Sequence, residues 1–220
     1  FQLICIYISL TSIPVYQIDL PLKVTIGICL IIWVYILNIT NFTDGSDGFL
    51  VTNSIFVFSN LLLINYIFEI DFFSKYLAII ILPSLLIFLY FNKPVAKMYL
   101  GDSGSILIGY FNGFIFLELL ILNQINLALS LLIYPILDCS IALIKKTLNG
   151  KLPWADTSNY SFLQPSIKKN KNKYFVFYFN IFFNFLNSFL IVCQIIYSWH
   201  FIFANIILAL VTMRIYEKKN

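Results

Sequence analysis

The chain has 220 residues, of which 60% are hydrophobic and 11% are charged, and its formal net charge is +4. Soluble globular domains carry about 25% charged residues, so this composition excludes an ordinary water-soluble domain. Long apolar stretches recur from end to end, which predicts an all-α, polytopic integral membrane helix bundle. No polar stretch is long enough for a soluble domain, so we expect a single transmembrane domain over residues 1–220, with a basic loop at 145–173.

The apolar stretches predict about eight transmembrane helices, since roughly 20 apolar residues are needed to cross a bilayer. In chain order, the expected spans cover residues 1–16, 24–39, 49–68, 76–91, 103–122, 127–144, 174–198 and 200–213. The first residue is Phe, and it already lies within an apolar run. We therefore expect the amino-terminal part of the protein to lie upstream of this residue.

The basic residues between these spans are distributed unevenly. With eight spans, the loops at 41–48, 92–102 and 145–173 and the carboxyl-terminal tail share one side, which holds all but two of the 14 Lys and Arg residues. The opposite side holds only Lys23 and Lys75. Because cytoplasmic loops are enriched in Lys and Arg, the crowded side is predicted to be cytoplasmic.

A first polar motif, Asn-Phe-Thr-Asp-Gly-Ser-Asp-Gly at residues 41–48, follows the second span. Asn41, Asp44 and Asp47 are spaced by three residues, so on helical geometry they would share one face. Two carboxylates at the mouth of a membrane helix are costly unless a partner offsets their charge. A hydrophilic turn between two spans is the alternative interpretation, since Asp-Gly is a common turn dipeptide.

A second polar motif, Asn-Lys-Pro-Val-Ala-Lys-Met-Tyr-Leu-Gly-Asp-Ser-Gly-Ser at residues 92–105, leads into the fifth span. One interpretation makes Asp102 the N-cap of that helix, because aspartate is a favoured capping residue. The other uses the free N–H groups of a helix amino-terminus, which can bind a phosphate. Asp102 would repel that phosphate unless Mg²⁺ lay between them, an arrangement that carboxylates and phosphates often share.

Two further groups of polar residues lie inside apolar spans. Asp138 falls in the sixth span, where an aspartate is a functional candidate by default, and an ion pair with a nearby lysine is the alternative. The seventh span carries a polar stripe, for which we predict hydrogen bonds to neighbouring helices. The stripe consists of Asn180, Asn184, Asn187 and Gln194.

The two motifs and the segment around Asp138 resemble the polyprenyl-phosphate N-acetylhexosamine-1-phosphate transferase family, over roughly residues 24–155. Residues 41–48 are similar to the family's Asn-Leu-Thr-Asp-Gly-Leu-Asp-Gly signature, and residues 92–105 are similar to its Pro-Ala-Lys…Gly-Asp-Ser/Thr-Gly-Ser block. The resemblance implies a multi-pass enzyme of the bacterial plasma membrane with a cytoplasmic active face. It would transfer a sugar-1-phosphate from a UDP-N-acetylamino sugar to a polyprenyl phosphate, giving UMP, in cell-envelope polysaccharide or peptidoglycan synthesis.

The resemblance also implies a cofactor and a catalytic set. The cofactor would be Mg²⁺, with Mn²⁺ as a substitute, and Asp102 would be its ligand. Asn41 and Asp44 would line the catalytic cleft near the diphosphate. This assignment suits phosphoryl transfer, in which positioning and charge neutralisation supply most of the catalysis. The expected partners are the UDP-sugar, the lipid and the membrane, with no nucleic acid, and a homodimer stays open.

Substrate binding is assigned by the same resemblance. The expected residues are Asp47, Asn92, Lys97 and Tyr99, together with Lys151, which is offered with Asp156 and Asn159 as a substitute for the histidines of the family's last cytoplasmic loop. Asp47 would contact the nucleotide, while Asn92 and Tyr99 would hold the uracil by hydrogen bonding and ring stacking.

Two departures from the family pattern keep other functions open. The family carries an adjacent Asp-Asp pair, whereas no two acidic residues are adjacent in this chain, and the topology predicts the pair upstream of Phe1. The family also has a His-rich last cytoplasmic loop, whereas residues 153–164 contain no histidine, and His200 is the only one in the chain. A non-catalytic transporter or lipid-binding scaffold and an inactive family remnant are therefore the alternatives.

Overall fold

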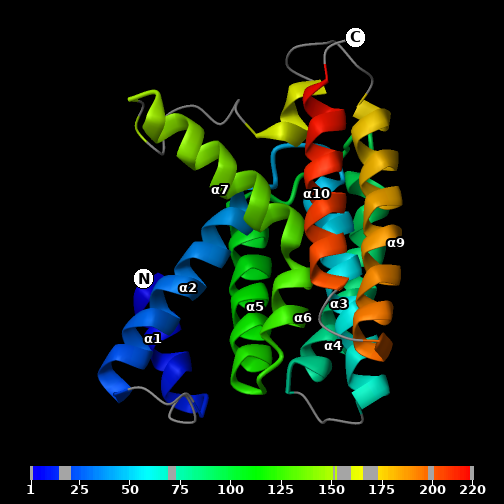
Figure 1. The fold of residues 1–220 in the computed structure, drawn as a ribbon. Coiled ribbons are helices and arrows are strands. Elements are labelled where there is room, and N and C mark those ends of the chain that lie inside the picture. The colour runs from blue at the N-terminus through cyan, green and yellow to red at the C-terminus, as the bar shows by residue number, and fades with distance from the viewer. Residues whose placement is uncertain are drawn as a thin grey trace.

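The computed structural model describes residues 2–14, 21–68, 73–150, 152, 160–165, 173–197 and 201–218. Within these ranges the regular secondary structure is helical, which confirms the all-α prediction (Figure 1). The elements are α1 (Gln2–Ser12), α2 (Leu22–Phe42), α3 (Phe49–Phe68), α4 (Phe73–Asn92), α5 (Gly101–Ile121), α6 (Ile125–Leu131), α7 (Ile133–Leu148), the 3-10 turn η3 (Ser161–Leu163), α9 (Lys173–Tyr197) and α10 (Phe201–Glu217).

Among the described residues, five helices are long and apolar enough to cross a membrane, namely α2, α3, α4, α5 and α9. The pair α6 and α7 adds a sixth span if it is counted as one broken crossing. Helices α1 and α10 occupy the first and last expected spans, but they have only 11 and 17 residues. A helix therefore lies in each expected span, whereas the count of eight full crossings is not confirmed.

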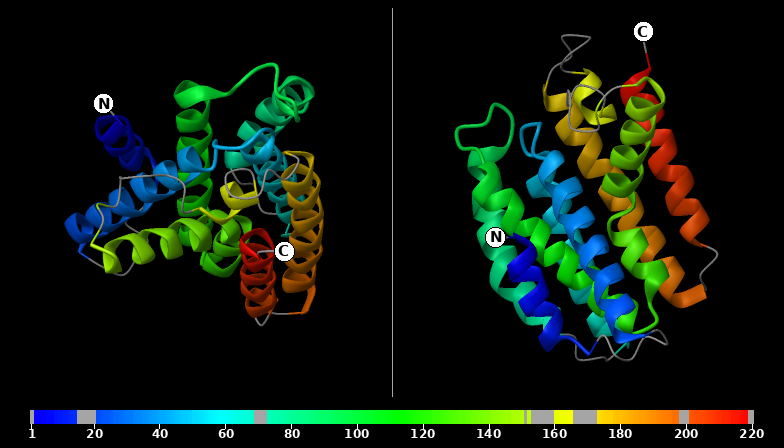
Figure 2. Two further views of the ribbon diagram at one scale, coloured as in Figure 1. Left: turned by 90° about the horizontal axis from the view of Figure 1, so that it is seen from above. Right: turned by 90° about the vertical axis from the view of Figure 1, so that its left-hand side faces the viewer.

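The sixth expected span is not a continuous helix. It bends by 75° between α6 and α7, and α7 then runs outward from the bundle on the side of α1 and α2 (Figures 1 and 2). Pro135 lies in the first turn of α7 and has no N–H to donate to Leu131, the last residue of α6. The missing backbone hydrogen bond explains why the helix is interrupted at this point.

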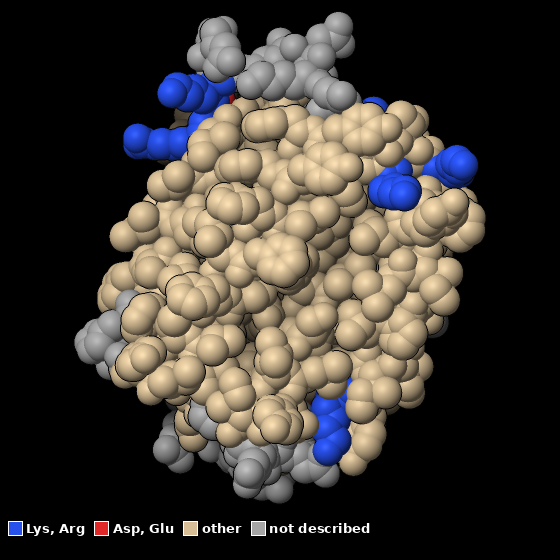
Figure 3. Space-filling model, turned by 90° about the vertical axis from the view of Figure 1, so that its right-hand side faces the viewer, with Lys and Arg blue, Asp and Glu red and all other residues tan. Residues whose placement is uncertain are grey.

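The outer surface is apolar over a broad band. Figure 3 shows one face on which Lys and Arg lie toward the two ends of the molecule, with a band between them that carries neither. Large apolar side chains such as Ile80 and Ile87 of α4 are exposed to 71% and 67%. Apolar surface of this extent requires a lipid environment, so the chain is a multi-span membrane protein.

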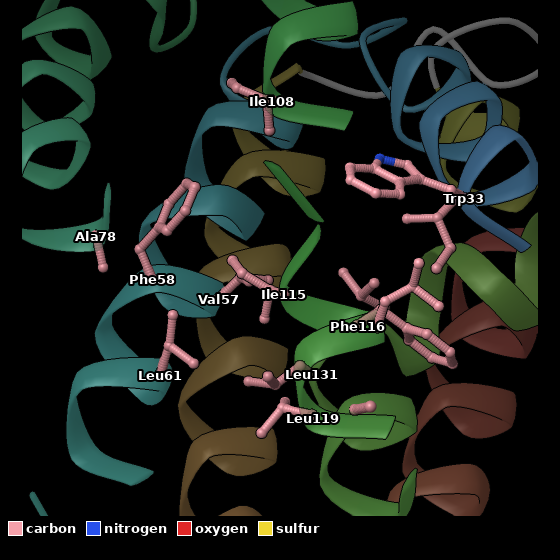
Figure 4. Close-up of a cluster of buried hydrophobic side chains, with 14 of the residues drawn as sticks. Trp33, Val57, Phe58, Leu61, Ala78, Ile108, Ile115, Phe116, Leu119 and Leu131 are labelled. Carbon is pink, nitrogen blue, oxygen red and sulfur yellow. The ribbon is translucent and has the colours of Figure 1, made fainter. Parts of the chain in front are cut away.

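Helices α2 and α5 pack closely because α5 carries two glycines four residues apart. A Cβ on Gly109 would lie 2.8 Å from the Leu37 carbonyl oxygen, and one on Gly113 would lie 2.1 Å from the Trp33 ring. The Trp33 indole N–H donates to the Tyr110 carbonyl oxygen at 2.9 Å, and the indole lies in the buried cluster of Figure 4. Small residues at this spacing let two membrane helices approach. The contact brings the carboxyl end of α2 to the amino end of α5.

The polar stripe of α9 forms hydrogen bonds to other helices, as the sequence predicts. Lipid tails offer no hydrogen-bond partners, so these polar side chains bond to neighbouring helices instead. They run from Asn180 to the Phe49 carbonyl oxygen (3.2 Å), from Asn184 to Asn53 (2.7 Å), from Asn187 to the Ser130 carbonyl oxygen (3.1 Å), and from the Ser130 hydroxyl to Gln194 (2.8 Å).

Candidate functional site

Two polar connections meet at one end of the bundle. The aspartate turn, residues 43–48, joins α2 to α3, and the 93–100 loop joins α4 to α5. Gly48 ends the aspartate turn with a φ of +72°, a left-handed conformation that glycine adopts without steric cost. A Cβ at this position would also lie 2.7 Å from the Phe177 ring of α9. Both the backbone angle and the space therefore require glycine here.

Hydrogen bonds fasten the aspartate turn to the 93–100 loop. The Gly48 N–H donates to the Asn92 side-chain oxygen at 3.1 Å, and the Asn92 amide donates to the Met98 carbonyl oxygen at 2.8 Å. The Ala96 N–H donates to the Asp47 carboxylate at 3.1 Å. The first and second sequence motifs are thus brought together into one structural unit.

Asp47 also holds the start of α9. Its buried carboxylate forms an ion pair with the Lys173 ammonium, with 3.1 Å between the two atoms. Asp47 and Asn92 therefore both make bonds that shape the site, and their expected contacts with the nucleotide and the uracil stay predictions. Sequence reasoning missed the role of Lys173, because an ion pair across 126 residues leaves no local signal.

Asp44 and Asp102 form a pair of neighbouring carboxylates. Asp44, half-buried in the aspartate turn, accepts a hydrogen bond from the Gly101 backbone N–H at the start of α5. Burial raises the pKa of Asp44 from 3.8 to about 6, the Gly101 hydrogen bond opposes this rise, and the negative charge of Asp102 adds to it. Asp102 itself is exposed in the first turn of α5. The two carboxylates repel each other, and a cation between them would relieve that repulsion.

Asn41 lies beside this pair in the last turn of α2. Its side-chain oxygen accepts a hydrogen bond from the Ser105 hydroxyl, which is buried in the second turn of α5. The structure therefore brings together the three residues expected to be catalytic, Asn41, Asp44 and Asp102, although their roles stay predictions. Sequence reasoning did not assign Ser105, although it is the last residue of the second motif.

Two geometric expectations from the sequence are wrong. Asn41, Asp44 and Asp47 do not share a helix face, because α2 ends at Phe42 and the chain then turns. Asp44 faces Gly101, whereas Asp47 faces the 93–100 loop. Asp102 is not the N-cap of α5 either, because the helix already begins one residue earlier and its N-cap is the preceding leucine, which makes no side-chain capping bond. Asp102 is therefore left exposed at the helix start.

The remaining expected substrate-binding residues differ in their placement. Tyr99 is 70% exposed, and Lys97, two residues before it in the 93–100 loop, is also exposed. Both side chains are accessible to a ligand. Lys151 lies outside the described residues, and so do the histidine-free segment 153–159 and His200.

The donor set limits how a metal could be held. Among the described residues, no group of three or more His, Cys, Asp or Glu side chains could hold a metal ion. Mg²⁺, however, is usually bound by one or two carboxylates together with waters and substrate phosphates. The pair of Asp44 and Asp102 fits that mode, in which a phosphate ligand completes the coordination.

Asp138 holds the η3 turn over the site. Its buried carboxylate accepts the Ser161 N–H at 3.0 and 3.2 Å from its two oxygens, and the Tyr134 hydroxyl lies 2.7 Å from the Ser161 hydroxyl. Leu163 of η3 in turn packs over the aspartate turn, where a Cβ on Gly45 would lie 3.1 Å from it. Within the part of the chain that the structure describes, the hydrogen bonds of Asp138 are to η3 and not to a lysine, which gives this carboxylate a structural role.

The profile of glycosyl transferase family 4 matches residues 1–120, which include both polar motifs and therefore the whole Asp44–Asp102 pair. The chain belongs to glycosyl transferase family 4. The family match ends before Asp138 and before the basic loop at 145–173.

Curated relatives of one name are similar to parts of the chain. It is 35% identical over 112 residues to phospho-N-acetylmuramoyl-pentapeptide-transferase of Leuconostoc citreum, covering 46% of this chain and 33% of the relative. The identity to the Aliarcobacter butzleri protein of the same name is 32% over 120 residues, again covering 46% and 33%. The identity to the Staphylococcus haemolyticus protein of the same name is 29% over 133 residues, covering 60% of this chain and 40% of the relative. The chain thus spans between a third and two fifths of the length of these relatives.

Proposed function

We propose that the protein transfers a sugar-1-phosphate from a UDP-linked amino sugar to a polyprenyl phosphate in the bacterial plasma membrane. The observation that carries this proposal is the meeting of Asp44 and Asp102, from two separate motifs, at one end of a membrane bundle. The names of the relatives, phospho-N-acetylmuramoyl-pentapeptide-transferase, support transfer in peptidoglycan synthesis. The UDP-sugar and the lipid are part of the proposal.

The proposed reaction is an exchange of phosphate bonds. An oxygen of the lipid phosphate attacks the β-phosphorus of the UDP-sugar, the bond from that phosphorus to the bridging oxygen breaks, and UMP leaves with the bridging oxygen. Mg²⁺ bound at Asp44 and Asp102 would neutralise charge on the diphosphate. Asn41, held by Ser105, would direct its amide toward the diphosphate, and the exposed Tyr99 ring would stack on the uracil.

The proposed site faces the cytoplasm, where UDP-sugars are made. Basic side chains flank the aspartate turn at this end of the bundle, with Lys93 and Lys97 in the 93–100 loop and Lys173 at the start of α9. Lys75, by contrast, lies in the first turn of α4, at the opposite end of that helix from Lys93. This distribution follows the enrichment of Lys and Arg in cytoplasmic loops.

The test is release of UMP by protein expressed from its complete coding sequence and purified into lipid nanodiscs. Undecaprenyl phosphate, Mg²⁺ or Mn²⁺, and a panel of UDP-sugars that includes UDP-N-acetylmuramoyl-pentapeptide and UDP-N-acetylglucosamine are supplied. One member of the panel should give UMP, and Asp102→Asn should abolish its release. Glu217→Gln, which neutralises an exposed carboxylate in the last turn of α10, is the control and should retain activity.

Two results would contradict this assignment. An Asp102→Asn variant that releases UMP at the wild-type rate would remove Asp102 from the reaction. Binding of a UDP-sugar by folded protein without UMP release from any combination would favour the non-catalytic alternative. Folding of each variant is checked by its thermal unfolding temperature.

A further inference from the structure

A small cavity lies inside the bundle, directly behind the aspartate turn. Its volume is about 20 Å³, and apolar residues such as Val57 and Leu131, both in the buried cluster of Figure 4, form part of its wall. The polar part of its lining comes from four helices and the turn itself. These polar residues are Thr40, Thr43, Asn53, Ser54, Asn112, Asn184 and Asn187.

Three asparagines of this lining each have one amide atom that bonds to no other described residue. They are the nitrogen of Asn53 on α3, the oxygen of Asn112 on α5 and the oxygen of Asn187 on α9. The three side chains are buried, with exposed fractions of 9%, 3% and 3%. Leaving polar atoms unpaired at such depth is unfavourable, so each requires a partner.

The other half of each amide forms a hydrogen bond. The Asn53 oxygen accepts from Asn184 at 2.7 Å, and the Asn112 nitrogen donates to the Thr40 hydroxyl at 3.3 Å. The Asn187 nitrogen donates to a backbone carbonyl oxygen of α6 at 3.1 Å. Rotating the Asn53 or the Asn187 amide by 180° would break its bond, because an amide N–H only donates and a carbonyl oxygen only accepts. Asn112 donates to the Thr40 hydroxyl in the orientation that the structure shows. The cavity therefore receives one hydrogen-bond donor and two acceptors.

We propose that this cavity is a binding site for one ordered water molecule that joins α3, α5 and α9. The water accepts a hydrogen bond from the Asn53 nitrogen and donates its two hydrogens to the oxygens of Asn112 and Asn187. A cavity needs about 10–15 Å³ to hold one water, so the volume fits one molecule and not two. A metal cation does not suit the site, because the Asn53 N–H group is a donor and not a ligand.

The position of the water connects it to the proposed functional site. Asn112 bonds to Thr40 in the last turn of α2, and the Thr43 hydroxyl of the aspartate turn donates to the Thr40 carbonyl oxygen at 2.6 Å. The water thus completes a polar network that supports the aspartate turn from inside the membrane. This role does not depend on the reaction proposed above.

The direct test is an experimental structure in nanodiscs at a resolution that shows ordered waters. A single density peak at hydrogen-bonding distance, about 2.7–3.2 Å, from all three amide atoms supports the proposal. The proposal is overturned by a cavity without density, by direct pairing of the three amides, or by a peak with the shorter distances of a coordinated cation.

A double-mutant cycle tests the same site in solution. Asn112→Ala and Asn187→Ala should each lower the unfolding temperature by several degrees, and the double variant should lose clearly less than the sum, because the two residues share one water. Val57→Ala combined with Asn112→Ala is the matched control, since Val57 lines the same cavity without a polar atom. Coupling in the asparagine pair no larger than in this control would overturn the proposal.

Discussion

Substitution Gly113→Ala tests whether the close contact between α2 and α5 supports the fold. The added Cβ would lie 2.1 Å from Cδ1 and 2.5 Å from Nε1 of Trp33, whose side chain is 0% exposed. Overpacking of this kind costs about 1–3 kcal/mol. Displacing the indole from the Tyr110 carbonyl oxygen adds about 0.5–1.5 kcal/mol. The higher helix propensity of alanine offsets about 1 kcal/mol. We expect a net destabilisation of roughly 1–3 kcal/mol.

The assay is thermal unfolding of purified protein in nanodiscs, with Gly27→Ala as the matched control. Gly27 also lies within a membrane helix, but a Cβ there would have no atom within 4 Å. The control should be neutral or slightly stabilising. For a chain of this length, each kcal/mol corresponds to about 2–4 °C, so Gly113→Ala should lower the unfolding temperature by roughly 3–10 °C.

Either of two outcomes would refute this reasoning. One is a Gly113→Ala variant that unfolds at the wild-type temperature. The other concerns Trp33→Leu, which removes the ring that the new methyl group meets. In that background Gly113→Ala should cost little, and an undiminished cost would show that the clash with Trp33 is not its cause.

Three further predictions follow from the site. The pKa of Asp44 is about 6 in the folded protein against 3.8 ordinarily, so folding takes up a proton and the stability contributed by this group falls as the pH rises from about 4 to 6. In the absence of divalent metal, the unfolding temperature of Asp44→Asn should therefore rise relative to that of the wild type across this pH range. A difference between the two proteins that does not change with pH would contradict this prediction. Asp47→Ala leaves a backbone N–H unpaired and should cost about 1–3 kcal/mol in chemical denaturation, whereas Lys173→Met, at a half-exposed ammonium, should cost under about 1 kcal/mol. Gly48 and Gly150 both have a positive φ, +72° and +67°, so alanine at either position should cost about 1–2 kcal/mol of backbone strain. A Cβ at Gly48 would also meet the Phe177 ring, whereas a Cβ at Gly150 would meet no atom within 4 Å, so Gly48→Ala should lower the unfolding temperature further. Equal decreases in the two variants would argue against that contact.

The sequence was sufficient for much of the fold, for physical reasons. Apolar runs near bilayer length must become helices in lipid, because the backbone can satisfy its hydrogen bonds in no other simple way. Polar motifs such as 41–48 and 92–105 must lie at helix ends, so their meeting at one end of the bundle followed from the number of helices between them. The α9 stripe was readable because buried amides require partners on other helices.

The parts that the sequence did not supply depend on where helices stop and on distant contacts. Three-residue spacing suggested one face for Asn41, Asp44 and Asp47, but spacing cannot reveal that α2 ends at Phe42. The break in the sixth span had a visible proline, yet the direction of α7 depends on its packing. The pair of glycines in α5, four residues apart, was a signal that could have predicted the α2–α5 contact.

The hydrogen bonds that join the aspartate turn to the 93–100 loop also bear on how tightly a ligand could bind. Ordering a free backbone residue costs about 1–2 kcal/mol of conformational entropy. The 93–100 loop is already held by Asp47 and Asn92 before any ligand arrives, so most of that entropy is lost during folding. Tyr99, whose ring is 70% exposed, is thus presented on a preorganised loop. Loosening the loop by Asp47→Ala should therefore weaken ligand affinity even where the ligand never touches Asp47.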